Sequence, residues 1–439
     1  MEDRDGRRRS ELPRTVVGVA TLACACGLAL SAWGTARAQE FGATAEVERP
    51  IPSGSEEDPT AAATVVERED RPRAAETTDE VMDEVPGART RRTGALGAFT
   101  GLSLRGADLD QTTVLLGDVP LGPVDGGAFD LSTIPLSMLE RVEVYRGGAP
   151  LGLGAGNVGG VVRLVPRDEQ GTRAEGTLGV GSFGLLTANA AASVVGERGT
   201  PAWNTVVGAR HTDGDYPYLD DGGTRFDDSD DVQRRRQNAQ LDEAWGLARM
   251  QLEAGDGTLD VIGAGFERTG GLTGSPVEEP TRTRRNRMRT LGIVSWGSDD
   301  DAETRVRVTA ASGFDRNALS DRLGEIAVPR LTDDRTVRGY ARADVEHDVT
   351  DWLGIATLGS YAVERYDPED VLAQRPVGSS VRHTVAVGAE ARLHGELGDT
   401  RVELRPSARL DVSEARLRET RPERADARED EVIEYVIER

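Results

Sequence analysis

Residues 113–167 read TVLLGDVPLGPVDGGAFDLSTIPLSMLERVEVYRGGAPLGLGAGNVGGVVRLVPR. A β-rich run over 113–116 ends at the turn pair Gly117-Asp118. Pro135 then suits the first turn of a short helix. Residues 141–146 alternate charged and apolar side chains, as a half-buried strand does, and a glycine-rich bend leads to a last strand over 161–165. The stretch therefore predicts a small α+β unit.

The bend contains a literal GxGxxG, from Gly154 to Gly159. A dinucleotide-binding loop needs a helix directly after these glycines, because the pyrophosphate binds at the helix N-terminus. Here a predicted strand follows instead. We interpret the glycines as a tight turn, and we expect no nucleotide and no other cofactor.

These elements resemble, in order, the plug domain of TonB-dependent outer-membrane receptors. Residues 115–120, 134–147 and 154–165 resemble the plug's "vDGvP", "iP…IerIEVlrGp" and "yGsgaigGvinI" elements, and 85–87 and 102–106 resemble its "lPGv" and "isiRG" turns. The residues that carry the resemblance are Pro86, Gly87, Arg105, Gly106, Gly117, Asp118, Pro135, Glu140, Arg141, Glu143, Arg146, Gly147, Gly154, Gly159 and Gly160. Leu116-Gly117 departs from the family's acidic residue but leaves the turn intact.

The resemblance implies a plug over residues 68–167. Within it we expect a helix over 77–85, ended by Pro86-Gly87. Arg141 and Glu143 alternate on one strand face, which predicts a solvated or lumen-facing charged stripe rather than a catalytic site. No combination of nucleophile, acid and base stands out, and we expect no enzymatic activity.

Composition excludes other classes. The chain has 439 residues, with 76 acidic against 53 basic residues and a net charge of −23, which argues against nucleic-acid binding. After residue 40 no run of 18 apolar residues exists, so membrane-spanning helices are not expected there. The 52 glycines fit a β-rich chain, whereas 4% aromatic residues is low for a membrane barrel with two aromatic girdles.

Residues 1–38 resemble a secretory signal peptide. A basic start precedes an apolar run over 16–33 and the small-x-small site Ala36-Arg37-Ala38, so we expect cleavage before Gln39. The alternative is a single membrane anchor. Both cysteines, Cys24 and Cys26, lie in this segment, so the mature chain would contain no disulfide.

Residues 39–60 are rich in proline, serine and acidic residues, and we expect a flexible periplasmic tether. Residues 61–67 follow it. The family resemblance implies a TonB box here, at Thr64, Val65, Val66 and Glu67, which would pair as an added strand with the inner-membrane energising protein TonB. The alternative is that these residues are only the plug's first strand.

Residues 172–439 alternate apolar and polar side chains in run after run. We expect strands over 173–180, 186–194, 203–209, 259–266, 288–296, 305–314, 337–349, 353–366, 382–394 and 402–410. Short turns alternate with long polar loops, as in an antiparallel transmembrane β-barrel of the outer membrane. The alternative is a secreted sandwich or solenoid.

Two features of the loop over 213–237 suggest binding chemistry. Tyr216 and Tyr218 are candidates for ligand contact, because tyrosine joins an apolar ring to a polar tip. Clustered carboxylates make calcium a weak candidate ligand, at Asp220, Asp221, Asp227, Asp228, Asp230 and Asp231. The four histidines show no metal-ligand spacing, and we assign no zinc or iron site.

The resemblance implies uptake of a scarce ligand, such as a siderophore or another metal chelate or cobalamin, across the outer membrane of a Gram-negative bacterium. Two alternatives stay open: a secreted or surface β-rich binding or signalling protein without transport, and a non-functional truncated receptor fragment. Plugged barrels use about 22 strands, whereas residues 172–413 hold roughly eleven by alternation. Because Arg439 is not a terminal aromatic residue, we expect the N-terminal half of a receptor, with an incomplete barrel.

Overall fold

The computed structural model describes residues 63–69, 77–94, 96–122, 127–146, 149–154, 159–168, 171–195, 200–221, 229–274, 279–299, 302–326, 328–373, 378–397, 400–418 and 434–438. The predicted signal peptide and tether, together with Gly147, Asp227 and Asp228, lie outside the described residues. Among the described helices, none is long and apolar enough to cross a membrane.

A small domain is built on a five-stranded sheet. In spatial order its strands are β1 (Ala63–Glu67), β6 (Leu139–Tyr145), β7 (Gly160–Pro166), β4 (Thr112–Leu116) and β5 (Val119–Pro120). Strand β4 runs parallel to β7, and the other pairs are antiparallel. A helix, α2 (Thr78–Asp83), and a hairpin of β2 (Ala88–Arg92) and β3 (Thr100–Leu104) complete the domain.

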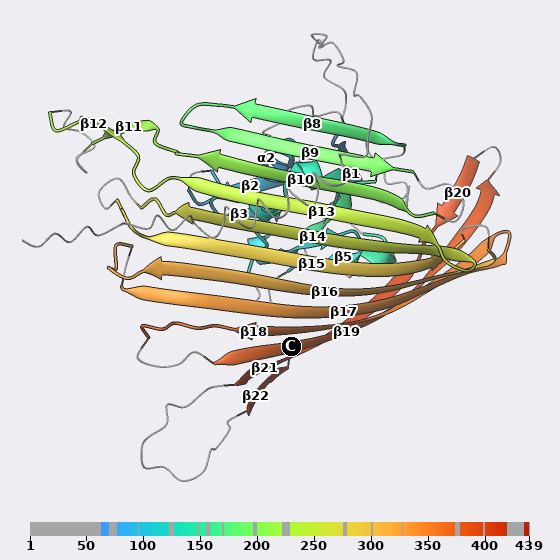
Figure 1. The fold of residues 1–439 in the computed structure, drawn as a ribbon. Helices are drawn as coiled ribbons and strands as arrows, with labels where there is room; N and C mark the ends of the chain where they lie inside the picture. Colours follow the sequence, from blue (N-terminus) through green and yellow to red (C-terminus); the bar gives the residue numbers. More distant parts are fainter. Residues whose placement is uncertain are drawn as a thin grey trace, which may run out of the picture. The chain divides into compact units, whose positions relative to one another are not determined.

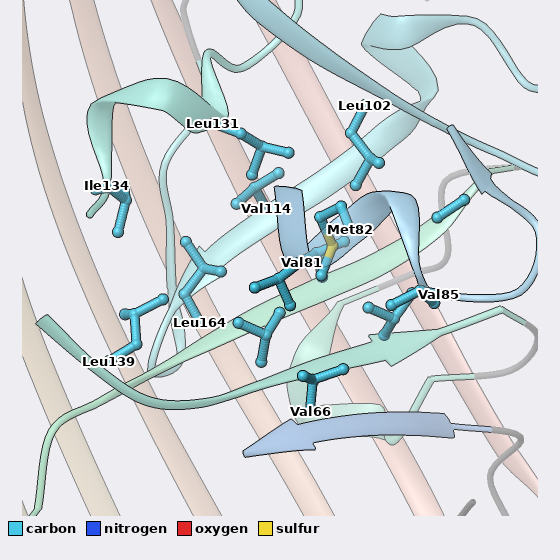
Figure 2. Close-up of a cluster of buried hydrophobic side chains, with 14 of the residues drawn as sticks. Val66, Val81, Met82, Val85, Leu102, Val114, Leu131, Ile134, Leu139 and Leu164 are labelled. Carbon is cyan, nitrogen blue, oxygen red and sulfur yellow. The ribbon is translucent and has the colours of Figure 1, made fainter. Parts of the chain in front are cut away.

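The core of the small domain lies between α2 and the sheet. Val81 and Met82 of α2 are fully buried against Val66, Leu139 and Leu164 of the strands (Figure 2). A side chain supports the start of the helix, because the Glu80 carboxylate accepts the Thr77 N–H at 3.1 Å. A helix is thus present in the predicted stretch 77–85, but it is shorter, Thr78–Asp83, with Thr77 as its N-cap and Glu84 as its C-cap.

The short helix predicted around Pro135 forms two separate 3-10 turns. These are η2 (Leu131–Thr133) and η3 (Leu136–Met138), and Pro135 is the N-cap of the second. Ile134 between them is extended, because a residue that precedes proline disfavours the helical region. A second pair of 3-10 turns is η1 (Leu109–Gln111) and η4 (Leu151–Leu153).

The second part is one large antiparallel sheet. Along the chain its strands are β8 (Arg173–Val180), β9 (Leu186–Val194), β10 (Ala202–Thr212), β13 (Leu241–Glu253), β14 (Gly257–Gly271), β15 (Arg284–Ser298), β16 (Thr304–Asp321), β17 (Arg330–Thr350), β18 (Leu353–Asp367), β19 (Ser379–Leu397), β20 (Thr400–Leu404), β21 (Ser407–Arg418) and β22 (Glu434–Glu438). Consecutive strands of this sheet pair with each other, except that β20 and β21 each pair with β19 (Figure 1). Among the described strands β8 and β22 do not pair with each other, so the described sheet is not closed.

The alternation predicted most of these strands and missed two, β13 and β22. Strand β13 carries Glu243 on the same face as the buried Trp245 and Leu247, and this charge interrupts the apolar pattern. The single strand predicted over 402–410 is wrong, because the chain breaks at Arg405-Pro406 into β20 and β21. Proline has no N–H to donate to the ladder, although its carbonyl accepts from Ala391 at 3.0 Å.

The connections differ in length at the two ends of the large sheet. Residues 254–256, 299–303 and 351–352 make short turns at one end, and 213–240, 272–283 and 322–329 make long loops at the other. We call these the short-turn end and the long-loop end. The long loop 213–240 contains its own hairpin, β11 (Pro217–Asp220) with β12 (Val232–Arg235).

Two glycines of the small domain allow the cost of backbone strain to be compared with the cost of a steric clash. Gly160 has φ +127°, and a Cβ there would lie 2.4 Å from the Tyr145 carbonyl oxygen, whereas Gly106 has φ +76° and nothing within 4 Å. We predict that Gly160→Ala lowers the free energy of unfolding by more than about 3 kcal/mol. Gly106→Ala should cost only about 1 kcal/mol, from its positive φ alone.

Hydrogen exchange of β6 and β7 peptides in the whole protein in detergent measures both effects. Equal losses of protection in the two variants would show that the contact at Tyr145 relaxes without cost.

Candidate ligand cavity between the small domain and the large sheet

A buried ion network runs through the small domain. Glu143 of β6, 1% exposed, accepts hydrogen bonds from Arg141 Nε at 2.7 Å and Tyr145 OH at 2.8 Å. Arg163 Nη1 lies 3.4 Å from the same carboxylate, and its Nη2 lies 3.0 Å from Asp118 Oδ1. Glu143 is therefore buried rather than solvated, because β7 pairs beside β6 and places Arg163 opposite it.

Asp118 extends this network to the large sheet. Its carboxylate lies 3.6 Å from Arg307 Nη1 of β16. Burial raises the pKa of the Asp118 carboxyl, but the positive charges of Arg163, Arg342 and Arg307 lower it by more. The pKa of Asp118 therefore lies below its ordinary value, and the group stays ionised between the two parts of the protein.

On the side of strands β13 to β15 the two parts are in close contact. Arg268 Nη2 of β14 donates to the Ser132 carbonyl at 2.7 Å, and its Nη1 donates to the Gly97 carbonyl at 2.6 Å. Arg287 Nη1 of β15 pairs with the buried Asp130 carboxylate. Trp245 Nε1 donates to Ser137 Oγ at 3.0 Å. These contacts fix η2 and η3 against the sheet.

On the side of β16 to β21 the two parts enclose a cavity of about 460 Å³. The small domain contributes apolar side chains to its lining, among them Val119, Leu121 and Leu153. The large sheet contributes Tyr340 and a row of charged residues. Apolar walls with a few convergent polar groups are typical of a small-molecule site.

The charged row is a continuous ladder across five strands. Arg289, Asp315, Arg338, Glu364 and Arg382 come from β15, β16, β17, β18 and β19 respectively. The Arg289 Nε to Asp315 Oδ1 distance is 2.5 Å, the Arg338 Nε to Glu364 Oε1 distance is 3.0 Å, and the Arg382 Nε to Glu364 Oε2 distance is 2.9 Å. Arg338 also pairs with Asp315. Sequence reasoning missed this ladder, although charged residues at inward positions of successive strands were a readable signal.

The turns predicted from motifs are found where expected. Gly87, Gly106, Gly117 and Gly154 all have positive φ, between +59° and +112°. The Gly87 carbonyl accepts from Arg105 N at 2.8 Å, and Gly117 N donates to the Leu164 carbonyl at 2.8 Å. Gly159 and Gly160 lead directly into β7, so a strand and not a helix follows the GxGxxG.

Further motif residues hold the domain together around these turns. Arg146 Nη1 donates to the Pro86 carbonyl at 3.2 Å, and the Glu140 carboxylate accepts from Asp168 N at 3.3 Å.

Thr64 to Glu67 form β1 in this structure. They pair with β6 from Thr64↔Val144 to Glu67↔Arg141, and Thr64, Val65 and Val66 are buried. The structure thus matches the alternative of a first strand of the small sheet. Their role in coupling stays a prediction.

The predicted loop candidates lie apart from the cavity. Tyr216 packs edge-on against Phe183, and the Arg236 guanidinium lies over the Tyr218 ring at 5.5 Å, but neither tyrosine lines the cavity. Asp220 pairs with Arg234 at 2.9 Å. In the described part of the chain no group of three or more acidic, histidine or cysteine residues could hold a metal ion. Calcium at this loop stays a prediction, because Asp227 and Asp228 lie outside the described residues.

A carboxylate ties two long loops together. Glu325 accepts hydrogen bonds from the backbone N–H groups of Thr281, Arg282 and Thr283 at 2.8–3.0 Å. These bonds lower the pKa of the Glu325 carboxyl to about 2, the largest contribution coming from Thr281 N–H. The long-loop end above the cavity therefore has at least one fixed point.

We predict that Asp118→Asn removes an acid-dependent part of the stability. Because the folded pKa of Asp118 is below its unfolded value near 3.9, its stabilisation is present above that pH and is lost as the pH falls through the folded pKa. The parent protein should be more stable than the variant at pH 7, and the two should converge in acid.

Thermal unfolding in detergent between about pH 3 and pH 7 measures this convergence. Asp110→Asn, which changes an exposed carboxylate of the same domain, is the matched control and should follow the parent. A constant gap between the parent and Asp118→Asn at every pH would contradict the prediction.

Comparisons with known proteins agree with this architecture. Residues 55–161 match the TonB-dependent Receptor Plug Domain family. The chain is 29% identical over 183 residues to the vitamin B12 transporter BtuB of Vibrio cholerae, a match that covers 39% of this chain and 29% of the transporter.

Solved structures share the fold at low identity. The ferric enterobactin receptor PfeA of Pseudomonas aeruginosa superposes with a TM-score of 0.62 and 14% identity, covering 85% of this chain and 62% of that one. The copper transporter OprC superposes with a TM-score of 0.64 and 14% identity, covering 84% and 56%. The chain thus spans less than two thirds of these relatives. Its small domain matches the plug-domain family and its large sheet shares the fold of these receptor structures, which is consistent with a TonB-dependent receptor.

Proposed function

We propose that this protein binds a scarce ligand at the cavity between plug and large sheet and moves it across an outer membrane, with energy supplied through TonB. The observation that carries the proposal is the cavity itself. Plug residues such as Val119 and Leu121 form one wall and strands β15 to β21 form the other, so a movement of the plug would change the site. Binding and passage, rather than catalysis, are the proposed activity.

The outer face of the large sheet supports a membrane location. Large apolar side chains are exposed there at alternating positions, among them Leu178, Val294, Val308, Val337, Ile355, Val385 and Val387. A membrane-spanning strand needs about 9–11 residues, and β13 to β19 each have 13 or more. We place the long-loop end outside the cell and the short-turn end in the periplasm.

The ligand class follows from the relatives and the cavity chemistry together. The names of the relatives indicate vitamin B12 for BtuB, and ferric enterobactin and ferric citrate for two of the solved receptors. We propose a metal chelate or cobalamin for this chain. An apolar floor beside a charge ladder suits a large ligand that carries both apolar and polar groups.

We predict that Ala362→Trp lowers ligand affinity by at least about tenfold, because the indole would occupy the cavity that Ala362 lines. Tyr361→Trp, one residue away on the other face of β18, is the matched control and should bind as the parent does. Binding of radiolabelled cyanocobalamin and of ferric enterobactin to whole cells measures both variants. Equal affinity in Ala362→Trp and Tyr361→Trp would contradict the assignment of the cavity.

For coupling, we propose that a TonB strand adds to the outer edge of β1. Strand β1 is the end strand of the plug sheet. Arg68 N donates to the Glu140 carbonyl at 2.9 Å, so by alternation the N–H groups of Thr64 and Val66 point to β6, and those of Val65 and Glu67 point to the outer edge. Because Val65 and Val66 are buried, this edge must be uncovered before a partner pairs with it.

Because the N–H groups of β1 point alternately to β6 and to the outer edge, proline at two successive positions makes a matched pair of variants. Val65→Pro should abolish uptake and leave surface binding intact, because it removes a donor at the outer edge only. Val66→Pro should weaken both, because it removes a donor from the β1–β6 ladder. Uptake and surface binding are measured separately with the two labelled ligands. Unchanged uptake in Val65→Pro would show that Thr64–Glu67 serves only as the first strand.

A further inference from the structure

Three cavities follow one another along β17. At the long-loop end, residues 331–335 line a cavity of about 390 Å³. Residues 338–340 line the ligand cavity described above, and Arg342, Asp344 and Glu346 line a third cavity of about 310 Å³ toward the short-turn end. Strand β18 repeats this order, with Ala362 in the middle cavity and Ala356 in the inner one. We call the last two the middle cavity and the inner cavity.

One short segment of the plug separates the middle cavity from the inner cavity. It is the turn η4, Leu151–Leu153, and Leu153 lines both cavities. Leu151 and Leu153 are buried, so the turn fills the space between the plug and the sheet at this level. We call it the strap.

Two arginines of the large sheet hold the strap by its backbone. Arg342 Nη1 of β17 donates to the Gly152 carbonyl, and Arg409 Nη1 of β21 donates to the Leu151 carbonyl at 3.2 Å. Each arginine is oriented by a carboxylate two residues further along its own strand. Arg342 Nε lies 2.7 Å from Asp344 Oδ2, and Arg409 Nε lies 3.0 Å from Asp411 Oδ2.

The fit around the strap is close. A Cβ on Gly152 would lie 2.7 Å from Arg342 Nη2, and a Cβ on Gly388 of β19 would lie 2.7 Å from Leu151 Cδ1. Glycine at both positions therefore lets the strap lie against the sheet. On the opposite side of the plug, η2 and η3 are bonded to β13, β14 and β15, as described above.

We propose that the strap is the partition that a ligand passes on its way from the middle cavity to the inner cavity, and that Arg342 and Arg409 are the positioning residues that keep it closed. That a ligand takes this route rests on the proposed function. That the strap closes the inner cavity does not rest on it, since access to the cavity can be measured without any ligand. Both bonds run to neutral carbonyls, so the strap can leave without separating an ion pair across the boundary.

The test compares two cysteine reporters on one strand, Ala356→Cys in the inner cavity and Ala362→Cys in the middle cavity. The full-length receptor, with Cys24 and Cys26 replaced by serine, is reconstituted in sealed vesicles that enclose a thiol quencher. A membrane-impermeant methanethiosulfonate is added on the side of the long loops, and the modification rates are measured. We expect position 362 to react faster than position 356 by roughly tenfold or more, because the strap must open before position 356 is reached.

Arg342→Met with Arg409→Met should raise the rate at position 356 by roughly tenfold and leave position 362 within about twofold. The matched control is Arg305→Met with Arg392→Met. These arginines also line the inner cavity, but their bonds run to Glu346, Asp348 and Glu390 of the sheet. The Arg305→Met, Arg392→Met variant should leave the ratio of the rates at positions 356 and 362 unchanged. Arg342→Lys and Arg409→Lys, which keep the charge and shorten the reach, should give intermediate rates at position 356 and cover the case in which the double variant does not fold.

Two results would overturn the proposal: equal rates at positions 356 and 362 in the parent, or an unchanged rate at 356 in every folded strap variant. Failure to bind or take up cyanocobalamin and ferric enterobactin would instead count against the proposed function, and the labelling result would stand apart from it.

Discussion

Arginine side chains that leave water between plug and sheet must each find acceptors, because an unpaired buried guanidinium costs several kcal/mol. At three contacts between plug and sheet, the sheet supplies the donor and the plug supplies the acceptor. Arg268, Arg342 and Arg409 all donate from strands to plug carbonyls. The carbonyls that accept belong to the 3-10 turns η2 and η4. Such short turns leave carbonyl oxygens without an internal partner, so they are suited to face a row of arginines.

The charges of these arginines are balanced within the sheet itself. Arg268 Nε lies 2.5 Å from Glu243, Arg342 is paired with Asp344, and Arg409 is paired with Asp411. Detaching the plug from these three residues therefore breaks hydrogen bonds to neutral groups, each worth about 1.5–3 kcal/mol. Removing one partner of a buried ion pair costs about 3–5 kcal/mol. Ion pairs cross the boundary at Asp130 with Arg287, where the carboxylate is buried, and at Arg167 with Glu175 of β8. The boundary is thus firmer at these two places than at the strap.

The plug and most strands of the large sheet could be predicted from the sequence because the signals for them are local. Turn glycines, the end of the helix at Pro86-Gly87 and alternation over 8 to 21 residues all act between neighbours. The cavity could not be predicted in this way. Its ladder joins residues from five strands, and whether Glu143 is solvated or buried depends on β7 pairing beside β6 with Arg163 opposite Glu143. Strand β13 was missed for the same reason. In the sequence Glu243 interrupts the apolar pattern, and only the structure shows that it pairs with Arg210 and Arg268.

A network of charges extends from the neighbour of β1 toward the strap. Val65 lies opposite Glu143 in the β1–β6 ladder, and Glu143 is bonded to Arg163. Arg163 holds Asp118, whose ionised state depends on the charge of Arg342, the residue that holds Gly152. Loss of β1 would expose Glu143 to water and weaken its hold on Arg163, because a buried carboxylate keeps its partner through low local dielectric. Arg163 is then less constrained beside Asp118, and Asp118 can shift toward the arginines of the sheet. Ion pairs thus run from Glu143 through Arg163 to Asp118, and the charge of Arg342, which holds the strap at Gly152, acts on Asp118.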